Sequence, residues 1–444
     1  MSEHDREGFE ALVRALSGQL QGTERLYASL NGEATAFVRM NRGRIRQPGT
    51  VRQSTLSLRL VDGRRHASAE LTLSGAADED LWRGADALRQ LRALLPALPE
   101  DPHLLLHDSD AVTVDAVDSA LPPAADIVDA ALDEAGDADM VGIFAGGEVW
   151  RGFGSSLGQR DWFSRGSFTL DWCLVHSADK AVKSTLAGDR FDPAALQAKM
   201  AAARQQLAVL SRPARKLTPG TYRAFLSPSA VGEVMGLLSW GSFGARALAA
   251  KSSPWNKLED GELRLDPRVH LVEDCAGGVA PRFGAEGFPV PAQVPLISGG
   301  ALVGRLVSPR SAVEFGVPHT GANSNEQPGS LSLAGGGLAP EAALGALGDG
   351  VWVGNLWYLN WSDRSVGRFT GMTRFATFWV EGGEIVAPVD VMRFDDSLYS
   401  WFGGALEDLT RAPELQLSTD TYFNRSTDSL RLPGALLSGL RFTL

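Results

Sequence analysis

The stretch with the strongest case for chemistry is residues 227–251, SPSAVGEVMGLLSWGSFGARALAAK, which the pattern predicts to be a helix. Ser227 is a good N-cap, and Pro228 suits the first helical position, where no backbone N–H is needed. A hydrolytic metal helix needs two imidazoles about one turn apart and a carboxylate beside them, to hold the ion and activate water. This helix offers Glu233 and no histidine, so the residues for such a centre are missing.

A second candidate is the pair His103 and His107 in PHLLLHDSD. Their spacing suits one metal ion if the segment is helical, and Asp108 and Asp110 could add oxygen ligands. Two prolines precede or open the segment, however, and favour a short strand or a loop end. Solvated or structural histidines are therefore the favoured interpretation.

A third candidate is GSSLG at 154–158, which fits the GxSxG pattern of a nucleophile on a strand-to-helix turn. The residues after it predict another strand, so the required helix is missing and a glycine-rich hairpin turn is favoured. A triad of Ser156, His176 and Asp171 stays open as an alternative, because proximity in sequence says nothing about geometry.

Glu286, in FGAEGFP, could serve as a general base or as a hydrogen-bond acceptor for a peptide N-terminus. An acid in a glycine-flanked turn is more often solvated, and we favour that interpretation.

The chain has only two cysteines, Cys173 and Cys275, and no CxxC pattern. We therefore expect neither a disulfide framework nor a thiolate metal site, and a reducing cytoplasm is the simplest location. Cys275 follows Glu273 and Asp274, and these acids should raise its pKa and weaken it as a nucleophile.

Tryptophans and asparagines interleave in the second half of the chain: Trp352, Trp357, Trp361, Trp379, Asn323, Asn355 and Asn360. Asparagine side chains can pair with an extended peptide backbone while indole rings cover its apolar side chains. Core tryptophans with turn asparagines are the alternative for any one residue. The candidates for peptide binding are Glu286, Asn323, Asn355, Trp357, Asn360 and Arg374.

The composition is that of a globular protein with sizeable cores, because 44% of its 444 residues are apolar. A net charge of −11 disfavours nucleic acid and anionic membrane surfaces as partners. The N-terminus lacks a basic region followed by an apolar run, and no run approaches the length of a membrane span. We expect neither export nor membrane insertion.

Hydrophobic periodicity predicts alternating helices and strands in the first half. The predicted helices cover residues 6–20, 78–95, 126–133 and 193–210. The predicted strands cover residues 26–30, 34–40, 56–60, 69–73, 141–144, 148–153 and 168–174. Asp62-Gly63 and Gly146-Gly147 are the predicted hairpin turns.

A domain boundary is predicted at residues 211–220, which carry two prolines, a glycine and four basic residues without an apolar period. The domains would then be 1–212 and 213–444. Short β-like runs broken by glycine follow the 227–251 helix. The predicted fold class is α+β: an N-terminal mixed α/β domain with antiparallel hairpins and a C-terminal, mainly antiparallel, barrel-like β domain opened by a helix.

Motifs in the second half resemble the TldD/PmbA family, two-domain proteins associated with proteolytic maturation of peptides. The clearest is FWVEGGEIVAPV at 378–389, which looks like the family's aromatic, Glu-x-Gly-Glu-Ile and Pro-Val stretch. Residues 283–287, 319–323 and 371–375 are similar to further family segments, in the family's order. FGAEG at 283–287 keeps the glutamate and final glycine of that segment but lacks both of its aspartates.

The resemblance also carries an expectation about chemistry, because this family contains two kinds of subunit. The TldD kind carries His-Glu-x-x-x-His on a helix and a later cysteine as a metal ligand, and the TldE kind lacks them and associates with the first. This sequence has no HExxxH, and no cysteine follows Cys275. The resemblance therefore implies a TldE-like subunit that holds no metal, with zinc in a TldD-like partner.

In that case the chain is a non-catalytic, cytoplasmic subunit that helps to enclose a chamber where the partner cleaves an unstructured peptide. Exposed apolar surface would mark a heterodimer interface, or a homodimer interface when the partner is absent. Two alternatives stay open. One is a self-sufficient hydrolase that uses Ser156 or a metal at His103 and His107, and the other is a peptide-binding scaffold without a peptidase partner.

Overall fold

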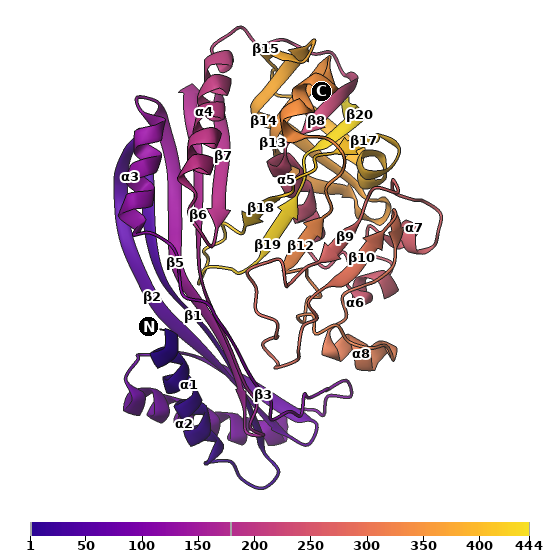
Figure 1. Ribbon diagram of the computed structural model, residues 1–444. Helices are drawn as coiled ribbons and strands as arrows, with labels where there is room; N and C mark the ends of the chain where they lie inside the picture. Colours follow the sequence, from indigo (N-terminus) through magenta and orange to yellow (C-terminus); the bar gives the residue numbers. More distant parts are fainter. Residues whose placement is uncertain (1, 178–179, 444) are drawn as a thin grey trace.

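The computed structural model describes residues 2–177 and 180–443 and consists of two parts (Figure 1). A long, strongly coiled sheet with four helices forms the N-terminal part, and a barrel with a second sheet forms the C-terminal part. The α+β fold class and the barrel-like C-terminal part predicted from the sequence are confirmed. No described helix is both long and apolar enough to cross a bilayer.

The N-terminal sheet has the strand order β3-β2-β1-β5-β6-β4, with β7 also paired to β6. Its strands are β1 (Arg25–Asn41), β2 (Arg44–Asp62), β3 (Arg65–Thr72), β4 (Val112–Ala116), β5 (Asp139–Ser155), β6 (Arg160–Ser177) and β7 (Lys180–Gly188). All pairs are antiparallel except β4 with β6. The hairpin at Asp62-Gly63 is confirmed.

Two helix pairs cover one face of this sheet. They are α1 (Ser2–Ser17) with α2 (Ala77–Leu94), and α3 (Ala124–Ala135) with α4 (Pro193–Leu210). Leu26 and Leu30 of β1 belong to the core under α1 and α2, whereas Val38 and Met40 belong to the core under α3 and α4. Even-numbered residues of one strand share a face, so both pairs pack on the same side. The C-terminal part contacts the other side, where Phe283 packs against Tyr27. Its residues Ala376 and Phe378 also join the core under α3 and α4.

Two strand predictions in this part are wrong. Residues 26–30 and 34–40 lie in one continuous strand, β1, and Gly146-Gly147 lies inside β5 rather than in a turn. A Cβ on Gly147 would lie 2.1 Å from the Ala34 carbonyl oxygen, so glycine here allows close strand packing and not a reversal. The chain reverses after Ser155, at the GSSLG segment, as predicted for that segment.

Five strands close the C-terminal barrel in the order β13-β8-β20-β16-β14, with β13 and β14 completing the ring. They are β8 (Gly220–Leu226), β13 (Gly350–Asp363), β14 (Arg368–Glu381), β16 (Arg393–Ser397) and β20 (Ala435–Phe442). Two further strands, β15 (Glu384–Pro388) and β17 (Leu406–Leu409), extend β14 and β20. Large aromatic side chains, including Phe369, Phe394 and Trp401, fill this core.

A second sheet lies beside the barrel in the order β11-β10-β9-β12-β19-β18. Its strands are β9 (Leu271–Glu273), β10 (Val294–Ser298), β11 (Ala301–Leu302), β12 (Ser330–Leu333), β18 (Glu414–Leu417) and β19 (Ser429–Leu432). The helices here are α5 (Pro228–Leu238), α6 (Ala245–Ala249), α7 (Asn256–Glu259), α8 (Pro309–Phe315) and α9 (Ala343–Leu347). Short helical turns η1 (Leu95–Ala97), η2 (Pro340–Ala342), η3 (Arg364–Val366) and η4 (Ser400–Gly404) complete the described elements.

The predicted helix at 227–251 is shorter than expected, and it does not open the C-terminal part. Strand β8 precedes it, and α5 ends at Leu238. Gly241 has a φ of +74°, which an α-helix does not allow, and α6 starts only after this turn. The proposed boundary between 212 and 213 lies in the connection from α4 to β8.

Candidate functional site

A cleft with a volume of about 540 Å³ lies between the N-terminal sheet and the C-terminal part. Strands β6 and β7 form one wall, α5 forms the second, and the loop 323–328 with β13 forms the third. Strands β18 and β19 and the residues next to them close the fourth side. Figure 1 shows α5 beside β7 and β18, at the junction of the two parts.

The local sequence explains why α5 turns a carboxylate toward this cleft. The Ser227 side chain accepts a hydrogen bond from the Ala230 N–H at 3.1 Å, which fixes the start of the helix as predicted. The apolar stripe at 231, 234, 235 and 238 is buried in the core. Glu233 lies off this stripe and lines the cleft.

The ionisable groups around Glu233 leave the cleft short of positive charge. Burial raises the pKa of Glu233, Lys183 opposes this rise, and Asp171 adds to it. Lys183 lies 3.8 Å from Asp171, which also accepts a hydrogen bond from the Thr185 hydroxyl at 2.8 Å. Burial likewise raises the pKa of Asp428, which lines the same cleft.

The asparagines at the cleft differ in how their side chains are used. Asn323 shapes its own loop: its Oδ1 accepts hydrogen bonds from the N–H groups of Asn325 and Gln327, at 3.0 and 3.2 Å. Asn355 on β13 is only 4% exposed, and its Oδ1 has no hydrogen-bond partner in the described structure. An orphaned buried amide is costly, so Asn355 is the more informative residue of the two.

The segment 418–428, which joins β18 to β19, is fixed to the N-terminal sheet by a buried arginine. The Arg425 guanidinium donates to the carbonyl and hydroxyl oxygens of Ser167, at 2.8 and 2.7 Å. Its backbone carbonyl accepts a hydrogen bond from Arg151 at 3.0 Å. Burial lowers the pKa of Arg425 to about 10 against the opposing effect of Glu33. One wall of the cleft is thereby attached to the sheet that carries the opposite wall.

The remaining candidates on β13 and β14 lie outside the cleft lining. The Arg374 guanidinium lies 4.1 Å from the ring centroid of Trp357, a cation–π contact, and Trp357 is 40% exposed. The Asn360 Oδ1 accepts a hydrogen bond from the Trp361 N–H at 2.8 Å. The structure thus brings Asn323 and Asn355 to one cleft and pairs Trp357 with Arg374 elsewhere on β13 and β14.

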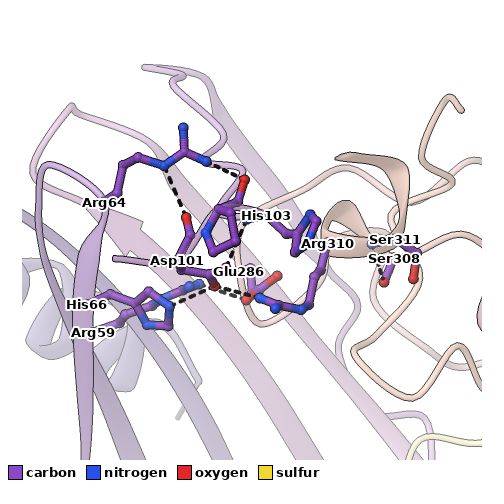
Figure 2. A network of polar contacts seen from close by, with 10 residues as sticks. Arg59, Arg64, His66, Asp101, His103, Glu286, Ser308, Arg310 and Ser311 are labelled. Carbon is purple, nitrogen blue, oxygen red and sulfur yellow. Dashed lines mark hydrogen bonds and ion pairs between the residues drawn. The ribbon is translucent and has the colours of Figure 1, made fainter. Parts of the chain in front are cut away.

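Glu286 is separate from all of these, because it forms an ion pair with Arg59 of β2 at 2.7 Å (Figure 2). Nearby, Asp101 accepts hydrogen bonds from the His103 N–H at 2.9 Å and from Arg310 of α8 at 2.5 Å. These polar contacts join the N-terminal sheet to the C-terminal part.

The charge balance at Asp101 favours its ionised form. Burial alone would raise the pKa of this carboxyl, but the His103 N–H, His66 and Arg310 together lower it to about 2. His103 contributes to this network through its backbone N–H, which donates to Asp101.

The side chains around His107 engage other partners. Asp108 forms an ion pair with Arg25 at 2.8 Å, and the His107 ring lies 5.3 Å from Phe288. Phe288 in turn lies 5.0 Å from His319, whose pKa is lowered by burial and by His107. Within residues 2–177 and 180–443, no group of three or more His, Cys, Asp and Glu side chains is arranged to hold a metal ion.

The triad of Ser156, His176 and Asp171 is not assembled. Ser156 lies in the turn before β6 and accepts a hydrogen bond from the Leu26 N–H at 3.1 Å, whereas His176 is at the far end of β6. At about 3.3 Å per residue, a strand of this length separates them by roughly 50 Å. Cys275 behaves as expected, since burial and then Glu273 raise its pKa to about 12.

Sequence reasoning missed the grouping of Glu233 with Lys183, Asp428 and Asn355. Glu233 was visible as the one acid on its helix. The others lie on β7, on β13 and just before β19, and no local pattern connects them. An acid on an otherwise apolar helix was the signal available in the sequence.

A closed five-stranded barrel beside a long antiparallel sheet, with a helix-lined cleft between them, defines the class of protein. Residues 219–443 match the family model of the PmbA/TldA metallopeptidase C-terminal domain. The match covers half of the chain, so the chain belongs to the PmbA/TldD family. No curated protein matches it in sequence.

Solved structures share the whole fold. TldE from Thermococcus kodakarensis superposes with a TM-score of 0.77 at 14% identity, over 98% of this chain and 100% of that one. A proposed modulator of DNA gyrase from Thermotoga maritima MSB8 gives 0.74 at 13% identity, over 98% and 99%. A similar protein from Bacteroides thetaiotaomicron VPI-5482 gives 0.73 at 16% identity, over 98% of both chains. At these identities the likeness shows the fold.

The cleft residues that the structure describes do not fit zinc. Zinc sites are built from His, Cys, Asp and Glu side chains, and Glu233 is the one residue of these types that α5 contributes to the cleft. The described residues with His, Cys, Asp or Glu side chains form no cluster that would replace them.

Proposed function

We propose that this chain is a TldE-like, non-catalytic subunit of a TldD/TldE-type metallopeptidase complex that acts on unstructured peptides. The observation that carries the proposal is the set of residues around Glu233 on α5. In a His-Glu-x-x-x-His helix, histidines precede the glutamate and follow it four residues later. Around Glu233 these positions are held by Gly232 and Leu237.

The space next to Gly232 supports the same proposal. A Cβ at this position would lie 2.3 Å from Oε1 of Gln416, whose Nε2 donates to the Pro228 carbonyl at 2.8 Å. A polar side chain from β18 thus occupies the space that a larger residue at position 232 needs. In this proposal zinc belongs to the TldD-like partner, and the complex works in the cytoplasm.

Exposed aromatic side chains suggest how a partner or a peptide is contacted. Trp240 at the edge of the cleft is 74% exposed, and Tyr422 and Phe423 in the 418–428 segment are 83% and 94% exposed. Isolated exposed aromatics are common, but three on the cleft and on the segment that contributes one of its walls are typical of contact surfaces. We propose that they meet the partner subunit.

The test is to measure zinc content and cleavage of an unstructured peptide, with the chain alone and after mixing with a TldD-like subunit. We expect the chain alone to hold no stoichiometric zinc and to be inert, and the mixture to cleave. A Ser156→Ala chain should support the same rate in the mixture. Stoichiometric zinc in the chain alone, or cleavage by it, would overturn the proposal.

A further inference from the structure

The lining of the cleft specifies the chemistry of its ligand. Glu233, Asp428 and Asn355 all present hydrogen-bond acceptors, and the Asn355 Oδ1 is buried without a partner. Lys183, the basic residue of the lining, already lies against Asp171. We propose that this cleft binds a protonated primary amine of a peptide, held between Glu233 and the Asn355 amide.

An ammonium group matches this lining because it carries three hydrogen-bond donors and no acceptor. It would supply the positive charge that Glu233 lacks, and it would give the Asn355 oxygen its missing donor. Charge-assisted hydrogen bonds of this kind are roughly twice as strong as neutral ones. An acceptor-rich wall therefore discriminates between an amine and its acetylated form.

A metal ion is a poorer match than an amine. The carboxylates of the lining come from β6, α5, β18 and the 418–428 segment and are spread along the cleft. Among the residues that the structure describes, they do not converge as a set of three ligands. A divalent cation requires such convergence, whereas an ammonium group needs only two or three acceptors.

The cleft also has room for the residues that follow the amine. Its volume of about 540 Å³ exceeds that of an amino group, and Trp240 at its edge offers an indole ring to an adjacent side chain. We assign the amine to a peptide because of the proposed function, and on this point the inference rests on the proposed function. The source is either a peptide amino terminus or a lysine side chain.

The experiment measures binding to the chain alone by fluorescence anisotropy, using an unstructured peptide labelled at its carboxyl end. The three probes are the peptide with a free amino terminus, the same peptide acetylated, and the acetylated peptide with one lysine. Acetylation should weaken binding about tenfold, since it removes a charged hydrogen bond. Rescue by lysine would show that a side-chain amine also serves as the source, and no rescue would restrict the site to the amino terminus. Equal affinity for all three probes would overturn the inference.

Two variants test the residues themselves. Glu233→Gln should weaken binding of the free-amine peptide about tenfold and leave the acetylated peptide unaffected. The control is Glu384→Gln, which removes the same charge from the exposed start of β15. If both variants have the same effect, overall charge explains the binding and the inference fails.

Asn355→Leu separates a binding role from a structural one. If the Asn355 amide serves a ligand, the variant loses affinity while its midpoint of thermal unfolding stays the same or rises, because an unsatisfied buried polar group is removed. A lower midpoint with unchanged affinity would assign Asn355 to the fold instead.

These outcomes are independent of the proposed function. Should the amine bind while a mixture with a TldD-like subunit stays inert, only the proposed function is lost. Should the mixture cleave while the three probes bind equally, only the amine site is lost.

Discussion

Carboxylates with raised pKa values set the electrostatics of this protein near its cleft. Glu233, Glu273 and Asp428 all have raised pKa values, in each case with burial as the largest cause. Of these three carboxylates, Glu273 has the best-defined hydrogen bonds. Its Oε1 accepts hydrogen bonds from the N–H groups of Gly329 and Ser330, both at 2.9 Å, and its Oε2 has none in the described structure.

Glu273→Gln should change how stability depends on pH. Burial raises the pKa of Glu273 from 4.5 to about 6, so the folded chain binds this proton more tightly than the unfolded chain. The resulting stabilisation is complete below 4.5 and is lost as the pH rises through about 6. The variant should flatten that slope in thermal unfolding, and it should be more stable near pH 7, on the order of 1 kcal/mol.

The exposed Glu384→Gln serves as the control, and it should keep the slope of the parent chain. An unchanged slope in Glu273→Gln would show that another group is responsible, with Asp428 the nearest candidate because it contributes to the same pKa.

At the scale of elements, α5 combines two opposing demands. Its apolar stripe packs into the core of the barrel part. On another side of the helix, Gly232 has no side chain, and this leaves room for the Gln416 side chain to lie across the helix. Glycine inside a helix costs about 1 kcal/mol relative to alanine. The hydrogen bond from Gln416 to the Pro228 carbonyl offsets part of that cost.

Gly232→Ala should therefore have an effect that depends on Gln416. In the parent chain the added Cβ displaces the Gln416 side chain, so the gain in helix propensity and the lost hydrogen bond nearly cancel. In a Gln416→Ala background the same change should stabilise the protein by about 1 kcal/mol. Urea unfolding of the four chains of this cycle measures the difference. Strictly additive effects would show that the Gln416 side chain does not lie against position 232.

At the scale of the whole molecule, the two parts are held together by polar contacts as well as by shape. The ion pairs of Arg59 with Glu286 and of Arg310 with Asp101 lie close together (Figure 2). Elsewhere, Arg425 joins the 418–428 segment to Ser167 of β6. Because the walls of the cleft belong to both parts, these contacts also determine its shape.

Asp101→Asn should weaken this connection in a pH-dependent way. The pKa of Asp101 is lowered from 3.8 to about 2, so its contribution to stability is complete above 3.8 and is lost as the pH falls toward 2. The variant should be less stable than the parent chain at neutral pH, and the gap should close as the pH falls through this window. Chemical unfolding at a series of pH values tests this, with the exposed Asp189→Asn as the control.

A pH-independent loss of stability in Asp101→Asn would mean that its hydrogen bonds, rather than its charge, connect the two parts. A loss equal to that of Asp189→Asn would remove Asp101 from the connection altogether.

The sequence by itself determined the features that depend on short stretches of chain. The cap and apolar stripe of α5, the hairpin at Asp62-Gly63, the turn at 154–158, the α+β class and the family motifs are all local or ordered patterns. Each has a physical cause within a few residues, such as helical period, strand alternation or turn geometry. Local patterns also misled, since Gly146-Gly147 resembles a turn until Ala34 of the neighbouring strand is in place.

Only the tertiary structure decided where the candidate site lies. Glu233, Lys183 and Asn355 line one cleft because α5, β7 and β13 pack around it, whereas Glu286 lies apart and pairs with Arg59. Whether an acid is solvated, paired or buried depends on contacts between residues far apart in sequence. Burial and charge pairing are properties of the packed chain, and they select the groups that are left to bind a ligand.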